Sequence, residues 1–235
     1  GNARAMYNYG NVLMDGKIVP QDINKSIEYF KTSSDLGYLK STMALATMHF
    51  FGYGIDVNKE EAFKYYRIAA NKGNDVAQFN YAYMLENGEG TTINKAEALK
   101  YYKMSSSQGH ESAIFHYSIM VYNGEGDELD KKQIMKYLQL LDVNNDGSPM
   151  LTLGFMLDVG DKVQINKDEA IKYYKIAIEK GNGTAMNNYA YILENGEGIP
   201  VDKKEAIKYY KMAIEKGEAS AMYHYAKMLH YGEGI

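Results

Sequence analysis

One stretch of this sequence has residue types and spacing that suit calcium binding. Residues 142–148 read DVNNDGS, which matches the first seven positions of an EF-hand loop, where carboxylate and amide oxygens coordinate the ion. The bidentate glutamate that such a loop needs at its twelfth position is replaced by Leu153, and Pro149 falls inside the loop. The pattern therefore favours a turn rich in Asn, Asp and Gly, and we expect no metal site.

The histidines do not form a catalytic arrangement. His110 and His116 lie six residues apart, which matches neither an i,i+4 pair on a helix nor the HExxH motif. His110 precedes Glu111 at an expected helix start, where we expect a solvated pair. The sequence also lacks a nucleophile elbow, a Walker motif and a Ser-His-Asp arrangement. We therefore expect neither enzymatic activity nor a cofactor.

Composition and charge argue against several other classes of protein. The 235 residues carry 26 basic and 30 acidic side chains, a net charge of −4, which gives no electrostatic footprint for nucleic acid. There is no cysteine, so disulfides and thiolate metal sites are excluded. No apolar run approaches the roughly 18 residues of a membrane span. We expect no membrane insertion, and a cytoplasmic location.

The element that must position any functional residue is a repeat of 36 residues. Near copies of one segment close on glycines that are separated by 36, 36, 72 and 36 residues, namely Gly37, Gly73, Gly109, Gly181 and Gly217. Self-similarity at such a period is typical of a solenoid. The repeat predicts a single solenoid domain over residues 1–235, about six and a half units that start near residues 1, 37, 73, 109, 145, 181 and 217.

Each unit is predicted to contain two helices joined by a glycine-bearing loop. Helix A is expected over residues 3–15 of the first unit and the equivalent residues of the others, where apolar residues recur on one helical face. Loops such as NGEG at residues 87–90 are expected to end helix A on a left-handed glycine. Helix B is expected to start after an Asn or Asp N-cap followed by a capping-box-like glutamate. These predicted caps are Asp22, Asn58, Asn94, Asp130, Asn166 and Asp202.

The repeat pattern is irregular in two places. At about residues 134–165 it weakens, and Ile134 replaces a small alanine, so we predict a joint there. The last unit stops after one helix, at residues 232–235. Because solenoid ends normally carry a polar capping helix, we expect either a fragment of a longer chain or end-to-end self-association through uncapped terminal repeats.

The 36-residue spacing, the NGEG loop and the helix B pattern KEAxKYYKxA resemble the Sel-one-like repeat (SLR) family. That family is similar to tetratricopeptide repeats but has a longer, glycine-containing loop between its helices. The resemblance covers essentially the whole chain and is poorest in the fourth and fifth units. It implies an all-α fold, a right-handed α/α superhelical solenoid of helix-turn-helix repeats, and adaptor or scaffold work in protein assemblies.

The resemblance also implies where a partner would bind. In a tetratricopeptide-like unit one edge of helix A faces a concave groove, and here that edge is rich in the aromatic residues that binding surfaces favour. The predicted binding residues are Tyr7, Asn11, Phe50, Phe79, Tyr83, Phe115, Ile119, Tyr122, Phe155, Asn187, Tyr191 and Tyr223. The alternative is that part of this stripe packs between neighbouring helices as core.

The sequence thus predicts a non-enzymatic scaffold or adaptor that binds a peptide or helix of a partner protein. We expect the binding site to be centred on Phe79, Tyr83, Phe115 and Tyr122. On this hypothesis, replacing Phe79 and Phe115 by Ala removes partner capture without unfolding the array. Two alternatives stay open: a spacer module that binds only copies of itself, and a regulatory repeat region of a larger protein with a catalytic domain such as a kinase.

Overall fold

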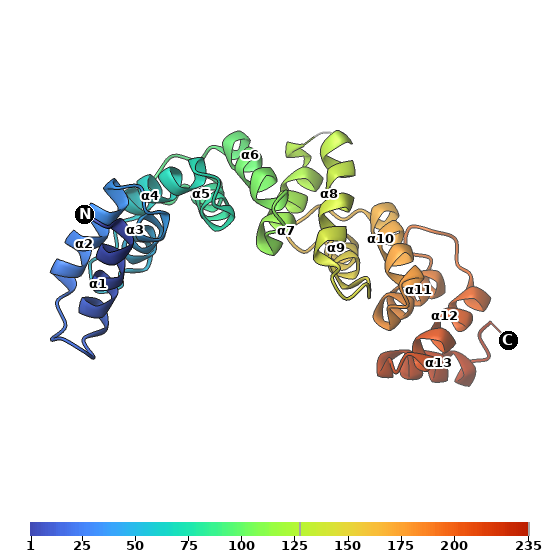
Figure 1. The fold of residues 1–235 in the computed structure, drawn as a ribbon. Coiled ribbons are helices and arrows are strands. Elements are labelled where there is room, and N and C mark those ends of the chain that lie inside the picture. The colour runs from blue at the N-terminus through green and yellow to red at the C-terminus, as the bar shows by residue number, and fades with distance from the viewer. Residues whose placement is uncertain (127, 235) are drawn as a thin grey trace. The chain divides into compact units, whose positions relative to one another are not determined.

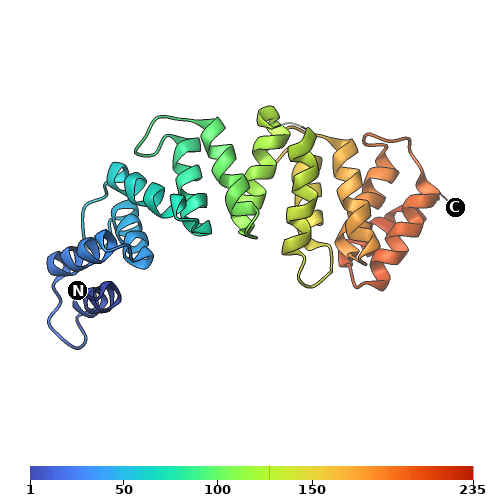
Figure 2. The same cartoon turned by 45° about the horizontal axis from the view of Figure 1, so that its top comes forward.

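The computed structural model describes residues 1–126 and 128–234. Within these residues every regular element is a helix, and there are thirteen α-helices and one short π-helix. Consecutive helices pack against each other, α1 against α2 and α3 against α4, as Figure 1 and Figure 2 both show. The predicted fold class, an all-α solenoid of helix-turn-helix repeats, is confirmed.

The chain divides into two compact units, Gly1–Tyr117 and Ser118–Ile235. The first contains α1 (Ala3–Asp15), α2 (Ile23–Asp35), α3 (Leu39–Phe51), α4 (Lys59–Asn71), α5 (Asp75–Asn87), α6 (Lys95–Ser106) and most of α7 (Glu111–Met120). The second contains the π-helix (Val121–Glu125), α8 (Glu128–Leu141), α9 (Ser148–Val159), α10 (Lys167–Glu179), α11 (Gly183–Asn195), α12 (Lys203–Glu215) and α13 (Ala219–His230). Odd-numbered helices are helix A of their repeats, and even-numbered helices are helix B.

Helix B starts at the predicted cap in most repeats. Asn58 is representative, because its Oδ1 accepts a hydrogen bond from the backbone amide of Glu61 at 3.0 Å. The backbone amide of Asn58 is engaged elsewhere, since it donates to the carbonyl of His49 at 2.8 Å. This bond replaces the return bond of a capping box and ties the start of helix B to the end of helix A. The same side-chain cap forms at Asp22, Asn94, Asn166 and Asp202.

Three of the glycine loops, those after α5, α11 and α13, also form an ion pair with the preceding repeat. In the loop after α5, Glu89 Oε2 lies 2.9 Å from Nζ of Lys59, the first residue of α4. Gly90 follows with φ of +66°, and a Cβ there would lie 2.3 Å from the carbonyl carbon and oxygen of Lys59. The loop is therefore an inter-repeat contact as well as a helix cap. The same ion pair recurs, at 2.6 and 2.8 Å, in Lys167–Glu197 and Lys203–Glu233.

The fourth repeat departs from the predicted pattern. Asp130, the expected N-cap, lies buried inside α8, because that helix already begins at Glu128. Helix A of this repeat continues from α7 into the π-helix, and Gly124, at the repeat position of the capping glycines Gly52 and Gly88, adopts the same left-handed backbone, with a φ of +89°. Helix B of this repeat, α8, begins at Glu128, three residues before the repeat position of Lys95, where α6 begins.

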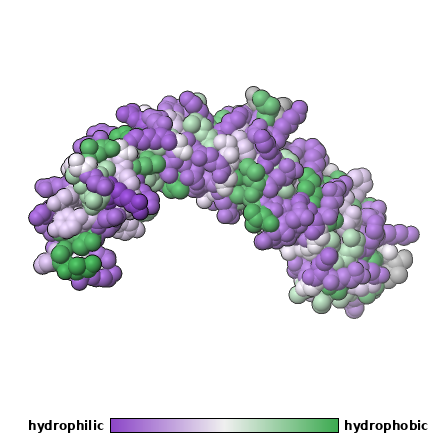
Figure 3. Space-filling view, in the orientation of Figure 1, coloured by the Kyte–Doolittle hydropathy of each residue, from purple (hydrophilic) through white to green (hydrophobic). Residues whose placement is uncertain are grey.

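The surface carries apolar side chains in small patches among polar ones (Figure 3). The large exposed apolar residues are spread over many helices and loops, from Tyr9 on α1 to Tyr231 after α13. Within the described residues, no helix combines the length and apolar character that a membrane crossing requires.

Candidate protein-binding surface

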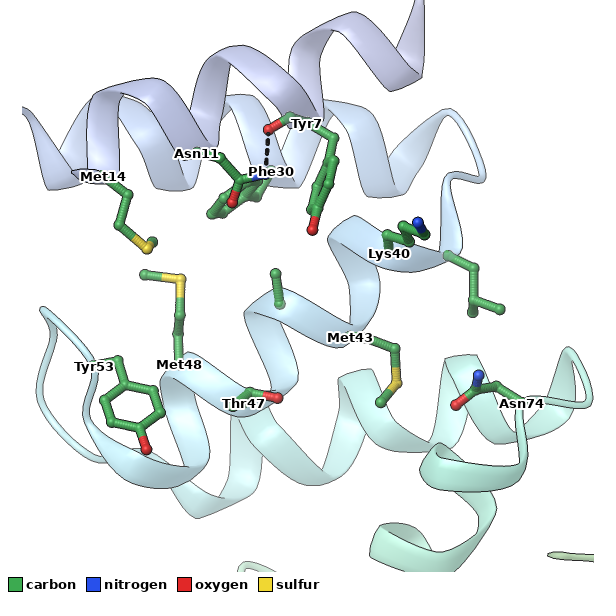
Figure 4. Close-up of a pocket in the computed structure, with 12 residues that line it drawn as sticks. Tyr7, Asn11, Met14, Phe30, Lys40, Met43, Thr47, Met48, Tyr53 and Asn74 are labelled. Atoms are coloured by element: carbon green, nitrogen blue, oxygen red, sulfur yellow. Dashed lines mark hydrogen bonds between the residues drawn. The ribbon is translucent and has the colours of Figure 1, made fainter. Parts of the chain in front are cut away.

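Helix A residues of the first two repeats line a pocket of about 600 Å³. Its walls come from one edge of α1 and one edge of α3, where residues three or four apart share a face. These wall residues are Tyr7, Asn11, Met14, Lys40, Met43 and Thr47. Figure 4 shows the ring of Tyr7 pointing into the cavity and the side chains of Met14 and Met48 approaching each other across it. Tyr7 and Asn11 are two of the predicted binding residues, and they lie together here.

The floor of the pocket is hydrophobic core. Phe30 and Met48 are buried, at 0% and 3% exposed, and the half-buried Tyr7 and Met14 pack over them. The ring centroid of Tyr7 lies 5.6 Å from that of Phe30 and 5.4 Å from that of Tyr38. These contacts fix the phenol of Tyr7 at the wall, so the pocket combines a rigid aromatic side with flexible methionines.

Two residues on α3 distinguish the wall of this pocket from the next repeat. Met43 and Thr47 stand at the repeat positions that α5 fills with Phe79 and Tyr83. The pocket wall on α3 therefore carries a flexible methionine and a small threonine where α5 carries two aromatic rings.

Phe79, a predicted centre of binding, is part of an aromatic cluster in the first unit. Its ring centroid lies 6.3 Å from Tyr83, 5.8 Å from Tyr102 and 5.5 Å from His116. The rings of Tyr102 and His116 also stack, at 5.1 Å. This packing supports the alternative that part of the aromatic stripe is core.

Replacing Phe79 by Ala is therefore expected to lower the free energy of unfolding by about 2 kcal/mol, less than for a fully buried ring because Phe79 is half-buried. Urea denaturation measures this change. Tyr223→Ala is the control, because Tyr223 is 69% exposed and its loss should cost no more than about 0.5 kcal/mol. Equal midpoints for the two variants would contradict the packing role of Phe79.

His110 is not the solvated residue that its neighbour Glu111 suggested. It is half-buried, and its Nδ1 accepts a hydrogen bond from the backbone amide of Ala113 at 3.2 Å. Burial lowers the pKa of His110, which favours the neutral imidazole that this acceptor role needs. His110 thus caps the start of α7 while its ring stacks on Phe79.

A carboxylate lies behind the Phe79 cluster. Oε2 of Glu86 accepts a hydrogen bond from Oη of Tyr102 at 2.6 Å and lies 3.2 Å from Nδ1 of His116. Burial alone would raise the pKa of Glu86, but the hydrogen bonds from His116 and Tyr102 lower it on balance. Burial and the bond to Glu86 raise the pKa of Tyr102, so its hydroxyl stays protonated and donates. The hydrogen bonds of Glu86 with Tyr102 and His116 thus connect α5 with α6 and α7.

Related hydrogen bonds between a tyrosine and a carboxylate occur in the second unit. They join Tyr174 to Asp158 at 3.1 Å and Tyr210 to Glu194 at 2.7 Å.

The pKa of Glu86 predicts part of the acid sensitivity of the fold. The pKa of Glu86 in the folded protein lies below its ordinary value of 4.5. The ionised carboxylate therefore stabilises the fold fully above pH 4.5, and this stabilisation is lost as the pH falls through the lower folded-state pKa. Glu86→Gln should therefore flatten the dependence of unfolding free energy on pH below 4.5. Urea titrations at neutral pH and in acid measure the slope, with Glu60→Gln on the exposed face of α4 as control. A slope in Glu86→Gln as steep as in the parent protein would contradict this assignment.

Two predicted binding residues of the second unit are engaged by the protein itself. Oη of Tyr122 lies 3.0 Å from Oη of Tyr173 and donates to Oε2 of Glu169 at 3.4 Å. Asn187 is only 8% exposed, and its Nδ2 donates to Oδ1 of Asn188 at 3.3 Å. The side chains of Tyr122 and Asn187 thus have hydrogen-bond partners within the second unit.

The remaining predicted binding residues differ in exposure. Phe155, Tyr191 and Tyr223 are exposed on α9, α11 and α13, at 48%, 42% and 69%. Half-buried side chains are those of Phe50 on α3, Tyr83 on α5, and Phe115 and Ile119 on α7. Phe50 also packs under a cation, because Nζ of Lys59 lies 3.1 Å from its ring centroid.

The stretch that resembles a calcium loop has its oxygens engaged by protein groups. Oδ1 of Asp142 accepts hydrogen bonds from the backbone amides of Asp146 and Gly147, both at 3.0 Å. Its Oδ2 lies 2.9 Å from Nζ of Lys180, which places a cation from α10 at the loop. Among the described residues, no group of three or more His, Asp or Glu side chains is arranged to hold a metal ion.

Comparison with known proteins places these helices in a family. A family model of the Sel1 repeat matches residues 3–38, 40–74, 75–110, 150–182, 183–218 and 219–235, which together exceed half of the chain. The chain belongs to the Sel1 repeat family. Residues 111–149, which include the π-helix and α8, lie between the third and fourth matched repeats. Sel1 repeats are typically protein-interaction modules and mediate contacts between proteins.

Two solved structures share the Sel1 repeat fold. A protective antigen of uropathogenic Escherichia coli with an SLR fold is 25% identical, with a TM-score of 0.61 over 96% of this chain and 48% of that protein. A Sel1 repeat protein from Oxalobacter formigenes is also 25% identical, with a TM-score of 0.57 over 90% of this chain and 85% of that protein. The chain thus spans about half the length of the E. coli protein. No curated protein matches it.

Within the Sel1 repeats, the predicted binding set omitted most of the pocket. Met14, Lys40, Met43 and Thr47 line it, yet none of them is aromatic, and the prediction weighted aromatic residues. Helical spacing does place them on the same edge as Tyr7 and Asn11. The cavity itself depends on which side chains fail to fill the space between helices, and spacing does not encode that.

Proposed function

We propose that this Sel1 repeat protein is a non-enzymatic scaffold that binds a peptide or helix of a partner protein. The binding surface is the helix A face of the first compact unit, Gly1–Tyr117. The observation that carries the proposal is the pocket between α1 and α3, whose volume of about 600 Å³ suits one or two large apolar side chains. A segment lying along helix A would insert its anchor residue there.

The chemistry of the pocket supports protein binding. Its floor of Phe30 and Met48 offers apolar area, and its wall of Met14 and Met43 adapts to different side chains. Tyr7 supplies a fixed ring with a polar hydroxyl, a combination that protein interfaces favour. Such a pocket can capture an apolar anchor side chain while polar groups at its rim orient the peptide backbone.

Selection from a random dodecapeptide display library tests the proposal. We expect the intact protein to enrich peptides that share a large apolar residue. The enriched peptides should bind far more weakly to Met43→Phe/Thr47→Tyr, a variant in which aromatic side chains fill the pocket. Failure to enrich any consensus, or equal binding to the filled variant, would contradict the proposal.

A further inference from the structure

The rim of this pocket carries positive charge that the protein leaves unpaired. Lys40 lines the pocket on α3, and Arg4 lies one turn before Tyr7 on the same face of α1. Both side chains are exposed, and neither forms an ion pair or a side-chain hydrogen bond with the residues that the structure describes. An unpaired cation beside an apolar cavity is available to a partner's anion.

The other polar groups of the lining are neutral, and three of them are already hydrogen-bonded, including Thr47, whose Oγ1 lies 3.5 Å from Oη of Tyr66. Nδ2 of Asn11 donates to the carbonyl of Tyr7 at 3.1 Å. Oδ1 of Asn74 caps α5 by accepting from the amide of Ala77 at 2.8 Å. No Asp or Glu occurs among the described residues that line the pocket. Lys40 is therefore the charged group that a ligand in this pocket would meet.

The helix A position that carries Arg4 and Lys40 is basic only in the first two repeats. The repeat position of Arg4 and Lys40 is taken on α5 by Val76, an apolar residue that is 41% exposed. Further along α5, the carboxylate of Glu86 is held by Tyr102 and His116. The unpaired cations and the open cavity thus coincide at α1 and α3, where one ligand can meet both.

We propose that the partner of this site is an acidic peptide, in which a large apolar side chain enters the pocket and a neighbouring Asp or Glu meets Lys40 and Arg4. This inference rests on the proposed function and specifies the chemistry of the ligand. The apolar residue supplies most of the affinity, and the carboxylate sets the sequence preference and the direction in which the peptide lies. Added salt weakens the charged contact and leaves the apolar contact in place.

Charge reversal at the rim tests the inference. The same dodecapeptide library is selected against the parent protein, against Arg4→Glu/Lys40→Glu and against Lys25→Glu/Lys31→Glu. The last variant changes the net charge equally from exposed positions on α2. Parent and α2 variant should enrich an apolar residue next to Asp or Glu. The rim variant should keep the apolar residue but enrich Lys or Arg beside it, and should bind the parent's consensus peptide about tenfold more weakly.

The outcomes separate this inference from the proposed function. An apolar consensus without acidic preference, or an acidic preference that survives Arg4→Glu/Lys40→Glu, would overturn the acidic-peptide inference and leave the pocket as a protein-binding site. No consensus with any of the three proteins would overturn both. Circular dichroism of each variant verifies that the helices are retained.

Discussion

Gly90→Ala is expected to lower the free energy of unfolding by about 3 kcal/mol. A left-handed backbone costs an alanine about 1 kcal/mol, and Gly90 has φ of +66°. Its new Cβ would also lie 2.3 Å from the carbonyl carbon of Lys59, a backbone atom of the first turn of α4 that cannot rotate away. Overpacking against a fixed element adds about 2 kcal/mol. Urea denaturation followed by circular dichroism measures the sum.

Gly73→Ala is the matched control. Gly73 has a similar φ of +86°, but a Cβ there would meet nothing within 4 Å. This variant should therefore cost only the backbone penalty of about 1 kcal/mol. If Gly90→Ala and Gly73→Ala lower the free energy of unfolding equally, the loop at Gly90 does not pack closely against Lys59 at the start of α4.

Filling the pocket is expected to remove peptide binding while the fold is retained. In Met43→Phe/Thr47→Tyr, α3 acquires aromatic residues of the kinds that α5 carries at the same repeat positions, Phe79 and Tyr83. Since the same framework accommodates these rings one repeat later, the variant should be at least as stable as the parent. Affinity for a selected peptide should fall about 30-fold or more, because an anchor side chain worth about 2 kcal/mol loses its cavity. Fluorescence polarisation with a labelled peptide measures this loss.

Met104→Phe is the control for this binding experiment. Met104 is 38% exposed on α6, outside the pocket, so the same substitution there should leave affinity unchanged. A filled variant that binds as tightly as the parent would place the peptide elsewhere. A filled variant that unfolds would show instead that the repeats do not accept each other's side chains.

Much of the fold follows from local chemistry that repeats in the sequence. Asn and Asp caps, left-handed glycines and apolar spacing fixed the helix bounds in most repeats. The exception shows the limit of this reasoning. Asp130 looks like the other caps, but its repeat continues from α7 into a π-helix, and α8 starts before it. Where a helix begins depends on tertiary packing that one residue pattern does not record.

Side-chain roles were harder to predict than helices. Lys59 and Glu89 are 30 residues apart, and Lys167 and Glu197 are separated by the same interval. The sequence therefore contains this ion pair as a lysine and a glutamate that recur 30 residues apart. A glycine loop that the pattern predicts as a helix cap gives no sign of this ion pair. Phe79 shows a different problem, because an aromatic residue on the groove edge has the same spacing whether it meets a partner or packs against Tyr102 and His116.

The most direct test of the central claim uses the methionine methyl groups as reporters. In a protein labelled with ¹³C at those methyls, a selected peptide should shift the resonances of Met14, Met43 and Met48, which line the pocket. Met186 and Met212, on α11 and α12 of the second unit, should stay in place. If saturating peptide shifts other methionines and leaves the three pocket resonances unchanged, the partner does not bind between α1 and α3.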